Sequence, residues 1–161
     1  MSLSVGKAQR LLAGLGAGVA LLFATAAVAG ECPAGKAGNN ALAGAATAGN
    51  GVTDTVLSSI DLADSPLKLS DRLFRFRRLV IEPGGIVPLH SHGDRPALIY
   101  VMSGSIYEYN SKCTVPILHS TGEVAQESIG LTHWWKNTSN VPTVLLAADL
   151  LHTKKDDGHS M

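Results

Sequence analysis

Short apolar–polar alternations, broken by Gly, Pro and Ser, dominate the chain beyond residue 54. The apolar positions are rich in β-branched and aromatic side chains, and no stretch has the period of a long helix. This pattern predicts an all-β sandwich or barrel. The expected strands cover residues 73–81, 97–102, 106–109, 115–119, 124–127, 132–136 and 143–151.

The first of these strands, residues 73–81, changes phase halfway. Its apolar residues occupy even positions and then odd ones: Phe74, Phe76, Leu79 and Ile81. One extra residue at Arg77–Arg78 would let all four face the core, which predicts a β-bulge there. The three arginines of the strand, Arg75 among them, then form a solvated face or a charged edge rather than an anion site.

The N-terminus has the pattern of a signal peptide over residues 1–29. Lys7 and Arg10 precede an apolar stretch, and Ala27-Val28-Ala29 forms a small-x-small cleavage site. An uncleaved membrane anchor is the alternative, because residues 11–28 approach the length of a span. Cleavage predicts a protein of the bacterial periplasm, or a secreted one, with no membrane association afterwards.

Residues 30–53 are mainly Ala, Gly and Asn, which predicts a flexible leader before the barrel, with an Ala-rich helix as the alternative. The barrel is expected over residues 54–152 and a polar tail over 153–161. The chain has two cysteines, Cys32 and Cys113. In an oxidising compartment they predict one disulfide, against the alternative of two free thiols. The formal net charge is zero and no basic stripe occurs, so nucleic acid is not an expected partner.

Three histidines have a spacing suited to metal binding. His90 and His92 are two residues apart on an expected strand, so their side chains project from the same face. His133 lies on a later strand. Imidazole is a common ligand for transition metals, but hydrogen-bonded core histidines would give the same spacing.

The flanking residues distinguish these interpretations. Residues 84–104 read GGIVPLHSHGDRPALIYVMSG, and residues 122–137 read GEVAQESIGLTHWWKN. Together they resemble the two conserved motifs of the cupin superfamily. The residues in register are Gly84, His90, His92, Gly104, Gly122, Gly130, His133 and Asn137. The resemblance implies a double-stranded β-helix, or small jelly-roll barrel. It also implies a divalent transition metal (Fe, Mn, Zn or Ni) held by the three histidines.

The sequence departs from the family pattern at two positions. Ala97 stands where the family has a glutamate ligand, and Ser128 stands where it has a proline. The loss of a carboxylate predicts a three-histidine site with weaker metal affinity, or a barrel that has lost its metal. Asp94 is expected in a surface turn rather than as a replacement ligand. His119 is expected to be an ordinary strand residue.

The resemblance implies a metal-dependent oxygenase, or an isomerase or lyase, that acts on a small molecule. Tyr100 and Trp135 are candidates for the pocket wall, since aromatic side chains are common in such sites. No general base can be identified. The alternative is a non-catalytic module that binds a small ligand or a metal, and a homodimer is expected by analogy with other cupins.

Overall fold

The computed structural model describes residues 30–153, so the expected signal peptide and the tail from residue 154 lie outside the described part. Within that part, no helix is long and apolar enough to cross a membrane. The described elements are one short 3-10 helix and eight strands. They are η1 (Asn40–Leu42), β1 (Asn50–Asp61), β2 (Arg72–Ser91), β3 (Ala97–Ser103), β4 (Ser105–Asn110), β5 (Ile117–Ser120), β6 (Val124–Glu127), β7 (Thr132–Lys136) and β8 (Thr143–His152).

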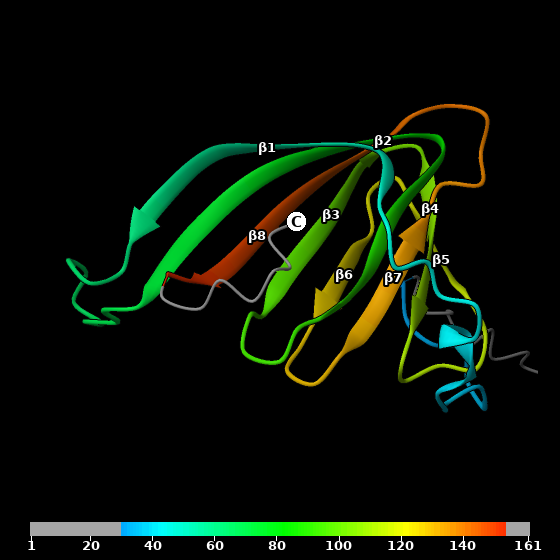
Figure 1. The fold of residues 1–161 in the computed structure, drawn as a ribbon, viewed down its shortest axis with the longest axis horizontal. Coiled ribbons are helices and arrows are strands. Elements are labelled where there is room, and N and C mark those ends of the chain that lie inside the picture. Colours follow the sequence, from blue (N-terminus) through cyan, green and yellow to red (C-terminus); the bar gives the residue numbers. More distant parts are fainter. Residues whose placement is uncertain (1–29, 154–161) are drawn as a thin grey trace, which may run out of the picture.

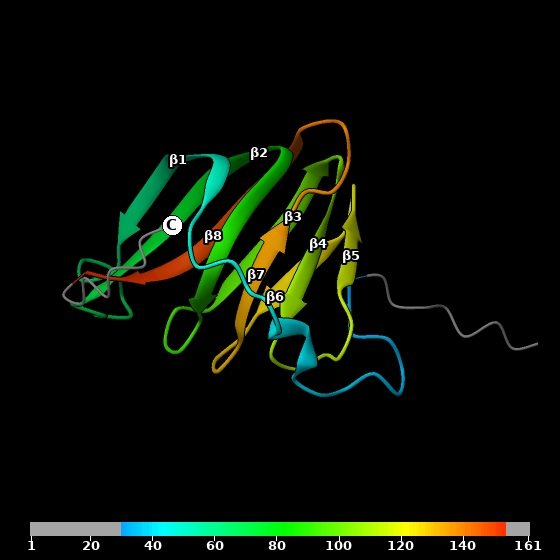
Figure 2. The same ribbon diagram turned by 45° about the vertical axis from the view of Figure 1, so that its right-hand side comes forward.

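The strands form one curled antiparallel sheet in the order β5-β4-β7-β2-β8-β3-β6 (Figures 1 and 2). The remaining strand, β1, lies outside this order and pairs with β2. The long strand β2 joins the two halves of the barrel. Its first half pairs with β8 and β1, and its second half pairs with β7. The all-β cupin barrel predicted from the sequence is therefore confirmed.

The apolar side chains that alternate inward fill one part of the barrel. The buried cluster consists of Leu79, Ile81, Val87, Ala97, Ile99, Val101, Ile106, Ala125, Trp135, Leu145 and Ala147. Tight turns let the strands reverse over it. Gly104 has a φ of 80°, and a Cβ there would lie 2.9 Å from Thr143 Oγ1, so the turn after β3 requires glycine.

The β-bulge predicted in β2 is wrong. The pairing of β2 with β8 continues without a shift from Arg72 to Ile81, and Phe74 and Phe76 face outward with 42% and 41% of their surface exposed. Arg75 and Arg77 alternate inward with Leu79 and Ile81 instead. The irregularity in this region lies on β1, between Val56 and Ser58.

Asp149 on β8 explains why the arginines can face inward. Arg75 donates two hydrogen bonds to its carboxylate, from Nε at 3.0 Å and from Nη2 at 2.7 Å. Arg77 Nη2 lies 3.3 Å from the same carboxylate, and Arg77 also pairs with Asp54 of β1. Bidentate pairing of this kind compensates the cost of removing both charges from water. The predicted solvated arginine face is therefore restricted to Arg78, which is exposed.

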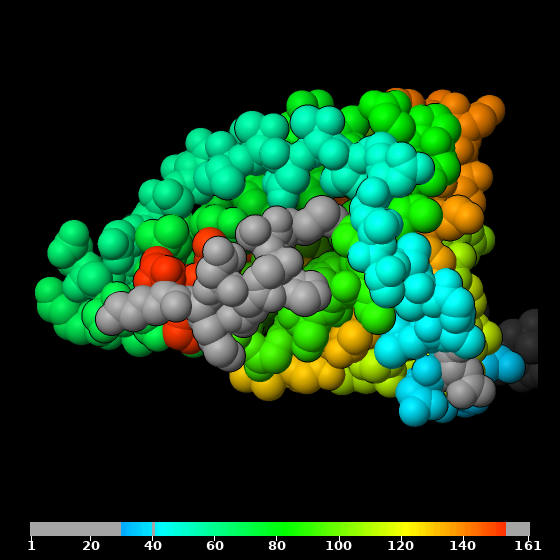
Figure 3. All heavy atoms as spheres, in the orientation of Figure 1, coloured from blue at the N-terminus to red at the C-terminus, as the bar shows by residue number. Residues whose placement is uncertain are grey.

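Residues 30–49 lie against the barrel, in contrast to the predicted flexible leader (Figure 3). A disulfide joins Cys32 to Cys113. Backbone hydrogen bonds attach Gly38 and Ala41 to residues 112 and 113, and the Leu89 amide donates to Ala46. The segment then continues into β1, which begins at Asn50 rather than after residue 54.

Removing this disulfide should lower stability. It closes a loop of 81 residues, for which the chain-entropy account gives a stabilisation of about 4–5 kcal/mol. We expect the Cys32→Ser/Cys113→Ser double variant to lose up to this amount in its free energy of unfolding, measured by urea denaturation. Reductant should lower the wild-type midpoint and leave that of the double variant unchanged. Equal midpoints for the two oxidised proteins would contradict the prediction.

Candidate metal centre

Three imidazoles meet where β2 and β7 pair. His90 lies directly opposite His133 in the register of these strands, and His92 lies just past the end of β2. The Nε2 atom of His90 lies 3.0 Å from that of His92 and 3.1 Å from that of His133. The structure therefore brings together the three histidines expected to bind a metal. Within the described chain, they form the group whose ligand atoms are close enough to share one ion.

The other nitrogen of each ring is already hydrogen-bonded. His90 Nδ1 lies 2.8 Å from the Pro88 carbonyl oxygen, and His92 Nδ1 lies 2.7 Å from that of Arg95. His133 Nδ1 lies 2.7 Å from Glu108 Oε1. Because carbonyl and carboxylate oxygens only accept, each Nδ1 carries the proton and donates it.

With each Nδ1 donating, the three Nε2 atoms present lone pairs to one another. Burial is the main cause that lowers the pKa of His90 to about 3 and that of His92 to about 4, so both rings are neutral at pH 7. Metal-binding histidines in proteins characteristically donate the second ring proton in this way, which fixes the tautomer and the ring orientation. The donor set fits a divalent transition metal.

Glu108 on β4 holds His133 in position from behind. Its carboxylate lies between two buried imidazoles, with Oε1 on His133 and Oε2 2.9 Å from His119 Nε2. Burial alone would raise the pKa of Glu108, but the hydrogen bonds from His119 and His133 outweigh it and lower the pKa to about 2. His119 is fully buried beside Trp135 and supports the site through Glu108, outside the metal-ligand cluster.

A second buried carboxylate, that of Glu127 on β6, faces the imidazoles from the other side. Glu127 Oε2 lies 3.0 Å from His92 Nε2, and Oε1 lies 3.4 Å from His133 Nε2. Only 4% of its surface is exposed, and this burial is the main cause that raises its pKa to about 7. Neither Glu108 nor Glu127 was predicted from the sequence as a site residue. Alternation along the strands could have indicated that both side chains face inward. Glu108 has the same phase as the buried Ile106 in β4, and Glu127 has the same phase as the buried Ala125 in β6.

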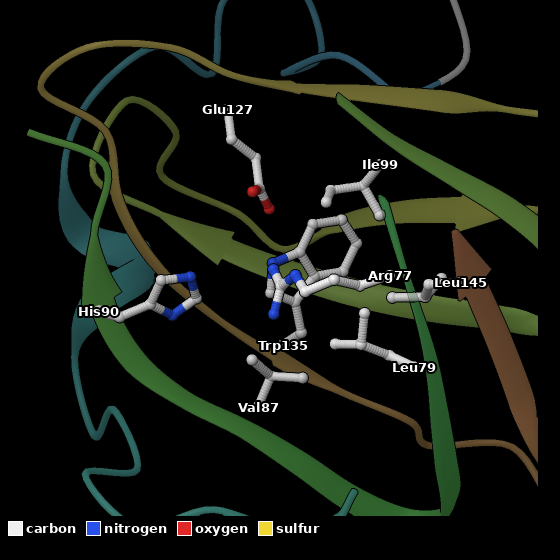
Figure 4. Close-up of a pocket in the computed structure, with 8 residues that line it drawn as sticks. All are labelled: Arg77, Leu79, Val87, His90, Ile99, Glu127, Trp135 and Leu145. Atoms are coloured by element: carbon white, nitrogen blue, oxygen red, sulfur yellow. The ribbon is translucent and has the colours of Figure 1, made fainter. Parts of the chain in front are cut away.

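A cavity of about 30 Å³ opens beside these groups. Figure 4 shows its lining residues: Arg77, Leu79, Val87, His90, Ile99, Glu127, Trp135 and Leu145. The wall therefore combines apolar side chains with an imidazole, a carboxylate and a guanidinium. Among the described residues, no acceptor lies within hydrogen-bonding distance of the buried Arg77 Nε, so this N–H is free for an oxygen in the cavity.

The other residues singled out in the sequence lie in different places. Trp135 lines the cavity, but Tyr100 does not: it is 40% exposed on the outer face of β3. Strand alternation explains this correction, because Ile99 and Val101 take the inward positions. Asp94 lies in a surface cluster, 3.1 Å from His152 Nε2 and 3.9 Å from Arg72 Nη2, and contributes nothing to the imidazole group.

Comparison with known proteins gives one family. The cupin domain family matches residues 77–149, a range that contains all three histidines and Glu127. No curated protein sequence matches the chain significantly.

Two solved structures illustrate the likeness in fold. A protein from Thermotoga maritima, described as a predicted oxalate decarboxylase, is 20% identical with a TM-score of 0.52. The match covers 68% of this chain and 95% of that one. The Cnp3 cupin domain of Schizosaccharomyces pombe is 12% identical with a TM-score of 0.51, over 70% of this chain and 73% of that one. At these identities the likeness establishes the fold alone.

The metal-free protein should lose stability in acid, most steeply below about pH 4.5. The unfolded chain protonates His90 and His92 near their ordinary pKa of 6.5, whereas the folded chain resists protonation down to about pH 3–4, so stability falls with pH across that window. The lowered pKa of Glu108 also makes stability fall as the pH falls, between about pH 4.5 and pH 2. The raised pKa of Glu127 has the opposite effect, so it makes stability rise as the pH falls, but only between about pH 7 and pH 4.5.

Urea denaturation of EDTA-treated protein from pH 7 to pH 3 would measure this profile. In the Glu108→Gln variant, the part of the loss below pH 4.5 that comes from Glu108 should disappear. A wild-type profile that stays flat between pH 4.5 and pH 3 would contradict the assignment of neutral, buried imidazoles.

Proposed function

This chain belongs to the cupin superfamily, and from that premise we propose that it is a metal-dependent enzyme acting on a small, oxyanion-bearing molecule. One observation carries the proposal: the Nε2 atoms of His92 and His133 both lie about 3 Å from that of His90, and all three lie within 4.8 Å of one another, while every Nδ1 is held by an acceptor. A purely structural histidine cluster has no need to point its lone pairs at one another.

The protein's own groups have separate tasks in this proposal. His90, His92 and His133 hold the divalent metal (Fe, Mn, Zn or Ni), which when bound supplies Lewis acidity and open positions for a small molecule. The apolar wall of the cavity excludes water, and Arg77 Nε donates to a substrate oxygen. A cavity of about 30 Å³ favours a substrate of few atoms. The reaction classes we propose are oxygenation and isomerisation or lyase chemistry.

The alternative is a non-catalytic module that binds a metal or a small ligand. The same cavity size favours it, because about 30 Å³ holds little beyond an ion and one or two water molecules. The two functions differ in one measurable respect. An enzyme consumes a small carboxylate, with or without dioxygen, only when the metal is present, whereas a binding module leaves the compound unchanged.

We propose that the protein works outside the cytoplasm, in a bacterial periplasm or in the secreted state. The Cys32–Cys113 disulfide supports this location, since such bonds persist in oxidising compartments. The signal-peptide pattern of residues 1–29 supports it independently.

Metal content tests the proposed function directly. Protein purified from the periplasm without added metal should contain a divalent transition metal, measured by inductively coupled plasma mass spectrometry. His133→Ala should abolish near-stoichiometric binding because it removes one of three ligands. The matched control is His152→Ala, whose imidazole lies in the surface cluster with Asp94. A wild-type protein that binds no transition metal at saturation would overturn the proposal, as would His133→Ala binding it as well as wild type.

A second copy of the chain is the partner we propose for the outer face of the sheet. Exposed apolar side chains of β2, β3 and β6 gather there: Phe74, Phe76, Leu98, Tyr100, Met102 and Val124. A contiguous apolar face of this kind is typical of an interface. Analytical ultracentrifugation should show a dimer that Leu98→Glu dissociates. Leu67→Glu, at an exposed position between β1 and β2, should leave it intact. A monomeric wild-type protein at high concentration would contradict this.

A further inference from the structure

We propose that Glu127 of β6 is the carboxylate ligand of the metal centre and replaces, from the neighbouring strand, the glutamate that the family motif places at Ala97. This inference rests on the proposed metal site. It differs from the sequence-based expectation, in which Ala97 marks a centre without a carboxylate. It also assigns a function to Glu127, a buried glutamate that is not one of the residues matching the cupin motifs.

The strand register places Glu127 next to the vacant motif position. Ala97 and Glu127 are direct cross-strand partners in the β3–β6 pair, so their side chains leave the sheet on the same face. Such partners have Cβ atoms about 4.5–5.5 Å apart, a distance that the length of a glutamate side chain spans. Both residues are buried. Because the alanine ends at Cβ, the space that a glutamate would fill at position 97 is available to Glu127.

The carboxylate of Glu127 points at the imidazole group. Its two oxygens lie 3.0 Å from His92 Nε2 and 3.4 Å from His133 Nε2. Since the Nδ1 atoms carry the ring protons, both pairs set acceptor against acceptor when Glu127 is ionised. Two acceptors at 3.0 Å repel unless a proton or a cation lies between them. A metal ion bound between the carboxylate and the imidazoles would satisfy these atoms. Glu127 lies outside the group whose ligand atoms are all within 4.8 Å of one another, so its side chain would have to approach His90 when the ion binds.

The nearby arginines are shared among several carboxylates, and their attraction for Glu127 is only part of their interactions. Arg77 pairs with Asp54 and Asp149, and Arg95 Nη1 lies 3.6 Å from Asp149. Glu108 is engaged by His119 and His133. A buried carboxylate needs a compensating charge, and a divalent ion at the imidazoles supplies it. With Glu127 as a ligand, the centre carries a net charge of one rather than two, as in a cupin with its glutamate in the usual place.

Four variants of the full chain, purified from the periplasm, test this inference. Glu127→Gln keeps the size of the side chain and removes its charge. Glu82→Gln is the matched control, at an exposed position of β2. Ala97→Glu adds the family carboxylate to the wild type, and Ala97→Glu/Glu127→Ala moves the carboxylate back to β3. The readouts are the Co²⁺ and Zn²⁺ affinities by calorimetry and the visible absorption spectrum of the Co²⁺ form, with circular dichroism as the folding check.

We expect Glu127→Gln to weaken binding about tenfold or more and to change the Co²⁺ spectrum at saturation, while Glu82→Gln changes neither. Ala97→Glu should not tighten binding, because the added carboxylate would lie beside one already present. The double variant should recover affinity relative to Glu127→Gln, which tests the relocation even if the single variant folds poorly.

The outcomes separate this inference from the function on which it rests. If the wild-type protein binds no metal, the proposed function itself fails. If His133→Ala loses the metal while Glu127→Gln keeps wild-type affinity and spectrum, only the ligand assignment is overturned. A tenfold gain in affinity for Ala97→Glu in the wild-type background would also overturn the assignment.

Discussion

Every polar side chain that the strands turn into this barrel must find its partner there, because water cannot provide one. This constraint accounts for most of the interior. Asp149 receives the two guanidinium groups of β2, and Glu108 joins His119 to His133. The Asn137 amide donates to the carbonyl oxygens of Ile81 and Val141 and ties the end of β7 to its neighbours. The buried pairs hold the strands in one register, since a shift by one residue would separate each pair and leave charges unpaired.

Against that background, the groups without a suitable partner are informative. The Nε2 atoms of the three imidazoles face only acceptors, either one another or Glu127, and the Arg77 Nε finds no acceptor among the described residues. His90, Glu127 and Arg77 line one cavity, whose remaining wall is apolar. Within the described part of the chain, buried side-chain atoms without a hydrogen-bond partner also occur at Arg72, His119, Trp134 and His152. At the imidazole group, by contrast, several acceptors converge on one another, which is the arrangement that a cation would satisfy. The polar partners thus build the scaffold, and the converging acceptors locate the site.

The sequence was most informative where alternation was regular and turn residues were clear. The expected strands at residues 124–127 and 132–136 coincide with β6 and β7. The histidine motif likewise placed His90, His92 and His133 together, because two short local patterns carry that information. The prediction from the sequence failed in β2, where the assumption that apolar residues are buried placed Phe74 and Phe76 on the inward face. The deciding residue, Asp149, is 74 positions from Arg75, and no local pattern connects them.

Strand β1 and the segment before it were missed for a related reason. Most of β1 is exposed and many of its residues are polar, so it shows little alternation; it is a strand because the first half of β2 offers it an edge. The course of residues 30–49 depends on the disulfide and on backbone hydrogen bonds to residues 112–113 and 89, all of which are contacts distant in sequence. Ala and Gly supply no side-chain signal for such contacts, since the backbone makes them.

The centre itself shows how far a linear motif can be trusted. The alternation of β6 suffices to turn Glu127 inward with Ala125, but only the β3–β6 register shows that it lies opposite Ala97. What a metal requires is an oxygen at the right point in space, and in a sheet two neighbouring strands can deliver a side chain to almost the same point. A carboxylate can therefore move from one strand to the next with little change in the position of its oxygens. The loss of a motif residue shows that a ligand is absent only when the cross-strand neighbours of the vacant position have no donor to offer.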